Sequence, residues 1–219
     1  SPARRRGFHP LRAGASSMTY LVSHLSIGLF LTVRRPLIPE ARELRDVLLT
    51  ALPLDATRLD SLIDVLAAKR VPCEMGGGLW RAAYTRGETP RWRIGSNVAG
   101  QVYDQRRGLV VNYGELLGPS LHFAAQGSFS AREPRSSRCP KDFDVSVESG
   151  GLVILGRPLF SDAISGPGAL RVLYVDSDIR IFETLRDSPN QWEARGLQVV
   201  QERGELVRGP SRLDGDAYC

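Results

Sequence analysis

The sequence predicts a mainly β protein in which two α-helices precede an antiparallel sandwich or closed barrel of eight or nine strands. Three observations lead to this fold class. The 219 residues are 42% hydrophobic and 24% charged, which is typical of a globular domain. Residues 40–69 carry apolar side chains at helical spacing. After residue 78 the chain changes to short β-rich runs separated by Gly, Pro, Ser and Asp.

Residues 1–38 are expected to form a basic and apolar N-terminal extension. Residues 1–17 are rich in Arg, Ser, Ala and Gly and contain no acid, a composition that resembles an organelle transit peptide. Residues 13–33 carry no Asp, Glu, Lys or Arg, and a helix of this length would span about 30 Å, one hydrocarbon core. Three alternatives stay open for this segment: a targeting remnant, a membrane-seated helix, or an element packed on the domain.

The positive charge of the chain belongs to this extension. It holds six of the 29 basic side chains and no acidic one, which leaves 23 basic against 24 acidic side chains in the rest. A near-neutral body argues against a nucleic-acid partner. An RNA-associated role would rest on Arg4–Arg6 alone.

Two amphipathic helices are predicted at residues 40–69. Pro39 and Glu40 open the first helix, and Pro53 ends it. Asp55 is the predicted N-cap of the second helix. Apolar side chains then recur at i, i+3, i+4 and i+7, at Leu59, Leu62, Ile63 and Leu66. We expect this stripe to pack on the body of the domain rather than to bind a partner.

The strands are predicted from alternating or β-rich runs between turn signals. They are Leu79–Tyr84, Val98–Tyr103, Leu109–Tyr113, Leu121–Ser130, Phe143–Glu148, Leu152–Leu155, Leu170–Val175, Ile179–Phe182 and, as the weakest pattern, Gln191–Ala194. Hairpin turns are expected at Arg107-Gly108, Ser149-Gly150-Gly151 and Asp176-Ser177-Asp178. The domain is therefore expected at 39–203, with a barrel at 79–200 and a tail at 204–219. A barrel of this strand number can hold one small ligand.

A Gly-x-Trp motif, Gly78-Leu79-Trp80, opens the first predicted strand. Glycine lets the chain turn tightly into the strand, and tryptophan can close one end of a barrel with its large apolar area. The motif resembles the lipocalin-type signature.

Several further segments, read in order, resemble the plastid lipid-associated protein family, also called fibrillins or plastoglobulins. They are LWRAAYT (79–85), GQVYDQ (100–105), LVVNYGEL (109–116), a strand ending in GSFS (127–130) and LRVLYVDSDIRIF (170–182). The most specific part is Tyr174-Val175-Asp176-Ser177-Asp178-Ile179-Arg180-Ile181, similar to the family's Tyr-Leu-Asp-x-Asp-Leu-Arg-Ile. The resemblance covers about residues 40–200. The chain departs from the family at Phe182, Glu183 and Thr184, where the family has a polar residue and Arg-Gly.

The resemblance implies a lipocalin-like β-barrel in the plastid (chloroplast), at the thylakoid membrane or plastoglobule. Its partners would be apolar lipids, with a prenylquinone, carotenoid or fatty acid as the bound molecule. An alternative is a non-catalytic structural subunit of a photosynthetic membrane complex, for example a photosystem. In that role residues 1–35 would contact the membrane surface or the complex. A carrier needs an interior cavity of several hundred Å³, whereas a scaffold fills the interior with side chains.

Strand alternation suggests which residues line the interior, although it leaves the face of each strand open. The candidate ligand-binding residues are Trp80, Tyr84, Val102, Val111, Phe123, Phe129 and Leu173. The candidate structural motif residues are Gly78, Trp80, Tyr174, Asp176, Asp178 and Arg180. Asp176-Ser177-Asp178 is typical of a turn, and such a turn would let Arg180 lie over Trp80 at the barrel end.

No catalytic residue, metal site or certain cofactor is predicted. The Asp176–Asp178 pair has no accompanying base or nucleophile. His9, His24 and His122 are scattered, and the three cysteines, Cys73, Cys139 and Cys219, match no zinc or redox spacing. Gly166-x-Gly168 lacks the rest of a dinucleotide fingerprint, and no Gly-x-Ser-x-Gly elbow occurs. The thiols are expected to be buried or free in a reducing compartment.

Overall fold

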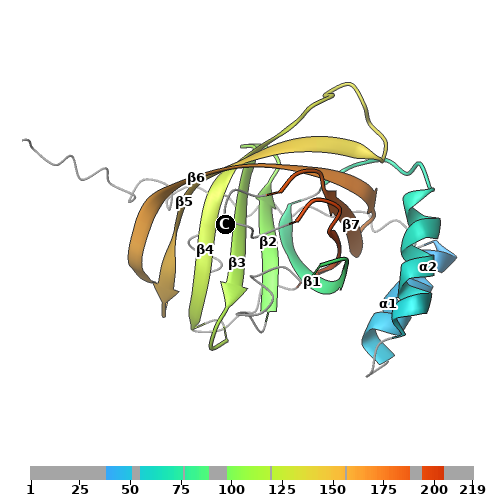
Figure 1. Cartoon of the computed structure of the whole chain (residues 1–219), viewed down its shortest axis with the longest axis horizontal. Helices are drawn as coiled ribbons and strands as arrows, with labels where there is room; N and C mark the ends of the chain where they lie inside the picture. The colour runs from blue at the N-terminus through green and yellow to red at the C-terminus, as the bar shows by residue number, and fades with distance from the viewer. Residues whose placement is uncertain are drawn as a thin grey trace, which may run out of the picture.

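The computed structural model confirms the predicted fold class and decides between sandwich and barrel. It describes residues 38–50, 55–75, 77–88, 98–118, 120–155, 157–187 and 194–204. Two helices precede eight antiparallel strands in which each strand pairs with the next (Figure 1). The last strand pairs with the first, with Trp80 opposite Arg203, so the sheet is a closed barrel. The uncharged segment at 13–33, the rest of residues 1–37 and the tail from 205 lie outside the described residues.

The helices are α1 (Pro39–Thr50) and α2 (Ala56–Ala67). The predicted N-cap of α2 is confirmed, because the Asp55 carboxylate accepts a hydrogen bond from the Arg58 backbone N–H at 3.1 Å. Figure 1 shows the two helices side by side at one end of the molecule, next to β7. The predicted stripe of α2 packs with α1 on the outer barrel wall, and the residues of this buried cluster are Ala41, Leu44, Leu59, Leu62, Ile63, Leu66, Leu173, Tyr174, Ile179, Ile181 and Val200.

The strands are β1 (Gly78–Arg86), β2 (Val98–Asp104), β3 (Leu109–Glu115), β4 (Leu121–Ala131), β5 (Lys141–Ile154), β6 (Arg157–Val175), β7 (Ile179–Thr184) and β8 (Gln198–Arg203). Two predicted turns are confirmed. Gly108 ends the β2–β3 turn with a φ of 65°, and the Asp176-Ser177-Asp178 turn joins β6 to β7. Gly78 enters β1 with a φ of 100°, the conformation that its predicted role requires.

The prediction of separate strands at Phe143–Glu148 and Leu152–Leu155 was wrong. Residues 143–148 and 152–154 belong to the single long strand β5, Leu155 lies in the turn that follows, and β6 begins at Arg157 instead of Leu170. The glycines that suggested a turn serve close strand packing instead. A Cβ atom on Gly151 would lie 2.0 Å from the Phe160 carbonyl oxygen, and one on Gly150 would lie 2.7 Å from Ile164 Cδ1. A local register shift beside Ser149 replaces the expected hairpin.

The last strand was also misplaced by the sequence prediction. Ala194 lies in a loop, and residues 191–193 of the weakly predicted strand lie outside the described residues. The closing strand is β8, so the barrel extends to Arg203 rather than to residue 200. Gln198 and Gln201 interrupt its apolar pattern, which explains why the run did not stand out as a strand.

A second apolar cluster fills the interior of the barrel at the end that carries β7 and β8. Its buried members are Cys73, Met75, Trp80, Tyr103, Val110, Cys139, Phe143, Leu170, Val172, Val175, Phe182, Leu197 and Val199. The sheet wall therefore separates two cores, one inside the barrel and one beneath the helices. This separation identifies the inner and outer faces of the strands.

We expect Ile63→Ala to lower the free energy of unfolding by about 2–5 kcal/mol, because Ile63 is fully buried between α2 and the barrel wall. Val65→Ala on the same helix is the matched control. Val65 is 41% exposed, so its truncation should change stability by less than about 0.5 kcal/mol. Urea unfolding measures both values. An equal loss of unfolding free energy in the two variants would contradict the packing of α2 against the barrel.

Candidate functional site in the barrel interior

A buried arginine lies at the centre of the filled end of the barrel. Arg180 on β7 has no exposed surface. Its guanidinium carbon lies 4.4 Å from the ring centroid of Tyr103 on β2, 5.3 Å from that of Trp80 on β1 and 5.4 Å from that of Phe182. The predicted stacking of Arg180 over Trp80 is therefore confirmed. Phe182, where the chain departs from the family pattern, supplies one of the three rings.

Two glutamines accept hydrogen bonds from this arginine. Nη2 of Arg180 donates hydrogen bonds to the side-chain oxygens of Gln101 and Gln201. The Tyr103 hydroxyl also donates to Gln101, at 2.9 Å, and the Gln101 amide nitrogen donates to Asn112 at 2.7 Å. The amides of three strands thus form a polar belt inside the apolar core.

This belt leaves part of the guanidinium without an acceptor. None of the ion pairs among the described residues includes Arg180. Its Nε and Nη1 atoms have no hydrogen-bond partner, and neither does the indole nitrogen of Trp80. Burial lowers the pKa of Arg180, because desolvation disfavours the charged form. Buried donors without acceptors are uncommon in folded proteins and require an explanation.

Side chains on the inner face of β4 become more exposed with distance from Arg180. Phe129 is half-buried and lies edge-to-face on Tyr103, with ring centroids 5.0 Å apart. Phe123 lies on the same face of β4 by strand alternation and is 41% exposed. Leu152 on β5 pairs with Phe123, and Phe160 on β6 pairs with Leu152. Phe160 is 48% exposed, so apolar side chains on the inner face are accessible in this half.

Two isoleucines extend this accessible apolar surface. Ile154 ends β5 and is 37% exposed, and Ile164 on β6 is 41% exposed and lies beside Gly150. We call Phe123, Leu152, Ile154, Phe160 and Ile164 the apolar inner face. It lies on the β5–β6 side of the barrel, which Figure 1 shows at the end of the molecule away from the helices. The barrel is thus filled at the Arg180 end and apolar and accessible at the other.

The predicted cavity residues divide between the two faces of the wall. Trp80, Phe123 and Phe129 lie on the inner face, as a ligand-lining role requires. Val102 and Val111 alternate with the interior residues Tyr103 and Val110, so they face outward.

Two more of the predicted cavity residues, Tyr84 and Leu173, also face outward. The register shift at Ala82/Tyr84 turns Tyr84 toward the helices, whereas Leu173 faces them because it alternates with the interior residue Val172. The Tyr84 hydroxyl accordingly donates to Asp60 of α2 at 2.9 Å.

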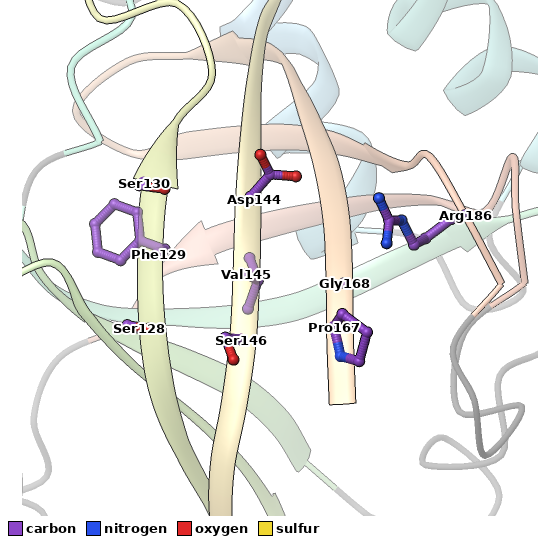
Figure 2. Close-up of a pocket in the computed structure, with 9 residues that line it drawn as sticks. All are labelled: Ser128, Phe129, Ser130, Asp144, Val145, Ser146, Pro167, Gly168 and Arg186. Carbon is purple, nitrogen blue, oxygen red and sulfur yellow. The ribbon is translucent and has the colours of Figure 1, made fainter. Parts of the chain in front are cut away.

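A separate recess of about 310 Å³ lies against β4, β5 and β6 (Figure 2). Its lining residues are Ser128, Phe129, Ser130, Asp144, Val145, Ser146, Pro167, Gly168 and Arg186. Figure 2 shows them on three neighbouring strands, with Arg186 reaching back toward β6 from the segment after β7. Serine, carboxylate and guanidinium groups border the recess together with the apolar residues Phe129, Val145 and Pro167.

The Asp176-Ser177-Asp178 turn has a structural role. Oδ1 of Asp176 accepts the backbone N–H groups of Asp178 at 2.8 Å and Ile179 at 2.7 Å. Oδ2 accepts the hydroxyl of buried Tyr174 at 2.7 Å. Burial and this carboxylate both raise the pKa of Tyr174. The carboxylate of Asp176 is therefore engaged in forming the turn that positions β7 and Arg180.

Two of the cysteines lie together inside the molecule. Cys73 and Cys139 are free thiols, and both are buried as expected, whereas Cys219 lies outside the described residues. Their segments pair through a bridge between Pro72 and Arg138. The hydrogen bond between the two thiols lowers the pKa of Cys73 and, with burial, raises that of Cys139.

No group of three or more His, Cys, Asp or Glu residues that could hold a metal ion occurs in the described part of the chain. Of the helices that the structure describes, none is long and apolar enough to cross a membrane. The chain matches no family model, no curated protein and no solved structure.

We expect Asp176→Ala to lower the free energy of unfolding by about 1–3 kcal/mol, because it leaves the buried Tyr174 hydroxyl and two backbone donors without an acceptor. Asp178→Ala is the control in the same turn. The Asp178 carboxylate accepts only the neighbouring Ser177 hydroxyl, so its loss should change stability by about 0.5 kcal/mol or less. Thermal unfolding compares the variants, and an equal or larger effect at Asp178 would contradict this account of the turn.

Proposed function

We propose that this chain is a non-enzymatic plastid protein whose barrel binds an apolar lipid at the thylakoid membrane or plastoglobule. A prenylquinone, a carotenoid and a fatty acid are the candidate lipids. The observation that carries the proposal is the apolar inner face, where Phe123, Ile154, Phe160 and Ile164 are 37–48% exposed on one face of the sheet. The resemblance to plastid lipid-associated proteins supports the compartment and the lipid class.

The energetics of the apolar inner face favour an apolar occupant. Burying apolar surface contributes about 25 cal/mol per Å². A contiguous exposed apolar surface on a folded protein commonly marks a ligand or partner site. A lipid chain that lies across β4, β5 and β6 would cover these side chains. It would extend the core that already surrounds Phe129 and Phe143.

A second candidate function is that of a structural subunit in a photosynthetic membrane complex. Leu155 in the β5–β6 turn and Leu159 at the start of β6 are 70% and 63% exposed. Such side chains suit contact with another protein or a membrane. In this role the barrel serves as a scaffold, and residues 1–35 contact the membrane surface or complex.

Organic extraction of the natively purified full chain, followed by mass spectrometry, tests the lipid-binding proposal. We expect one apolar lipid per chain. Phe160→Gln should lower the lipid content about tenfold, because the lipid loses about 1.5–3 kcal/mol of apolar contact. Leu49→Gln on α1 is the matched control, since Leu49 is 66% exposed and lies away from the barrel interior, and it should leave the lipid content unchanged.

Two results would count against lipid binding in the barrel. The first is a chain that carries no lipid from plastid membranes or from added lipid. The second is bulk membrane lipid that is retained equally by the Phe160→Gln and Leu49→Gln variants. Either result would favour the structural-subunit alternative, and isolation of the intact complex through residues 1–35 would then test that role.

A further inference from the structure

Two adjoining turns carry a cluster of exposed apolar side chains. One turn joins β3 to β4, and the other joins β5 to β6 at the end of the molecule away from the helices (Figure 1). The Leu155 backbone N–H in the second turn donates to the Ser120 carbonyl oxygen in the first at 2.8 Å, so the two turns are in contact. The exposed apolar side chains at these turns, which we call the apolar tip, are Leu117, Ile154, Leu155, Leu159 and Phe160.

We propose that the apolar tip enters a lipid surface, with Arg157 at the level of anionic headgroups. The inference rests on the proposed lipid-binding function and deepens it, because it names the surface through which the barrel meets the membrane. Nine large apolar side chains are exposed among the described residues, and five of them belong to the apolar tip. Two more, Phe123 and Ile164, belong to the apolar inner face. Such a concentration on one side of a protein marks a binding surface.

The backbone at Leu155 has a conformation that leucine rarely adopts. Its φ is 43°, the only positive φ outside glycine among the described residues. Glycine or asparagine would adopt this left-handed conformation at lower cost, and asparagine would also suit the water around a side chain that is 70% exposed. Neither folding nor solubility therefore explains a leucine here. Insertion into an apolar phase explains it, because the leucine side chain then stabilises the bound state.

Backbone hydrogen bonds within the turns favour a lipid surface as the partner. A turn that enters hydrocarbon finds no water there, so its backbone N–H groups need acceptors within the protein. The N–H groups of Leu116 and Leu117 donate to the Leu121 carbonyl oxygen at 2.9 and 3.4 Å. The N–H of Leu155 is bound to Ser120. These three groups keep their acceptors when the apolar tip leaves water.

The charges at the two turns suit anionic lipid. Residues 116–120 and 154–160 contain no Asp or Glu, and their single charged side chain is the exposed Arg157. Anionic headgroups would repel a carboxylate. An arginine can lay its apolar stem along the hydrocarbon and keep its guanidinium among the headgroups.

The apolar tip is continuous with the apolar inner face. Ile154 and Phe160 belong to both, and Phe160 pairs with Leu152 across β5 and β6. A lipid that leaves the membrane at the tip would therefore reach the inner face along apolar side chains. This continuity favours a lipid surface over a second protein as the occupant of the tip.

A fluorescent label locates the tip relative to a bilayer. Leu159→Cys in a Cys219→Ser background of the full chain is labelled with a polarity-sensitive dye, because Cys73 and Cys139 are buried. Vesicles of phosphatidylcholine with about 30% phosphatidylglycerol are added, with or without bromine on the acyl chains. We expect the emission to shift to shorter wavelength and the brominated lipid to quench it.

Leu49→Cys in the same background is the matched control, because Leu49 is 66% exposed on α1, and its label should not respond. Each label reports its own surroundings, so vesicle binding through residues 1–35 does not mimic the result. A chain that does not bind the vesicles, or one that binds while the Leu159 label stays in water, would overturn the inference. A wavelength shift without vesicles that grows with protein concentration would also overturn it, by assigning the tip to a second copy.

Two further variants measure the contribution of single side chains to vesicle binding by sedimentation. Leu155→Asn should lower the partition coefficient about tenfold and raise the melting temperature, because asparagine is more polar and tolerates the left-handed backbone. Arg157→Gln should weaken binding about fivefold on the vesicles with phosphatidylglycerol and not at all on pure phosphatidylcholine. Leu49→Gln should leave the partition coefficient unchanged. Vesicle binding that Leu155→Asn does not weaken would contradict the proposal.

The outcomes separate this inference from the proposed function. A chain that yields one extracted lipid per copy while the Leu159 label stays in water would refute docking through the apolar tip and leave lipid binding in the barrel intact. A tip that enters vesicles on a chain that carries no lipid would refute lipid binding in the barrel and leave the docking surface intact.

Discussion

The burial of the Arg180 guanidinium is the constraint on which the arrangement of the barrel depends. Arg180 can remain in the interior only if aromatic rings and amide oxygens from other strands surround it. Trp80 comes from β1, Tyr103 and Gln101 from β2, and Gln201 from β8. Closure of the sheet through the β1–β8 pair brings these strands together around β7. The closed topology and the buried charge therefore support each other.

Local irregularities in the strands assign residues to the two faces of the barrel wall. The bulge beside Tyr84 turns that residue toward Asp60 of α2, and the bulge beside Tyr174 lets both Leu173 and Tyr174 pack under the helices. The helices thus cover the outer wall near β7. The inner face at the distant β5–β6 side keeps apolar residues accessible, and this contrast underlies the proposed function.

The fold was largely predictable from the sequence, because helical spacing around Ile63 and short β runs after residue 78 are local patterns. The Asp176 turn and the contact of Arg180 with Trp80 were predictable for the same reason. The cavity residues were less predictable, since face assignment depends on bulges that no local pattern reveals, as at Tyr84. Gln101 and Gln201 were not identified as site residues, because their role appears only when distant strands pair.

The most direct test of the account is a crystal structure of the chain with palmitic acid that carries bromine on its terminal carbon. The account predicts anomalous bromine density beside Phe123 and Phe160 on the apolar inner face. Bromine density in the recess at Arg186, or an interior filled by side chains with the lipid bound elsewhere, would contradict it.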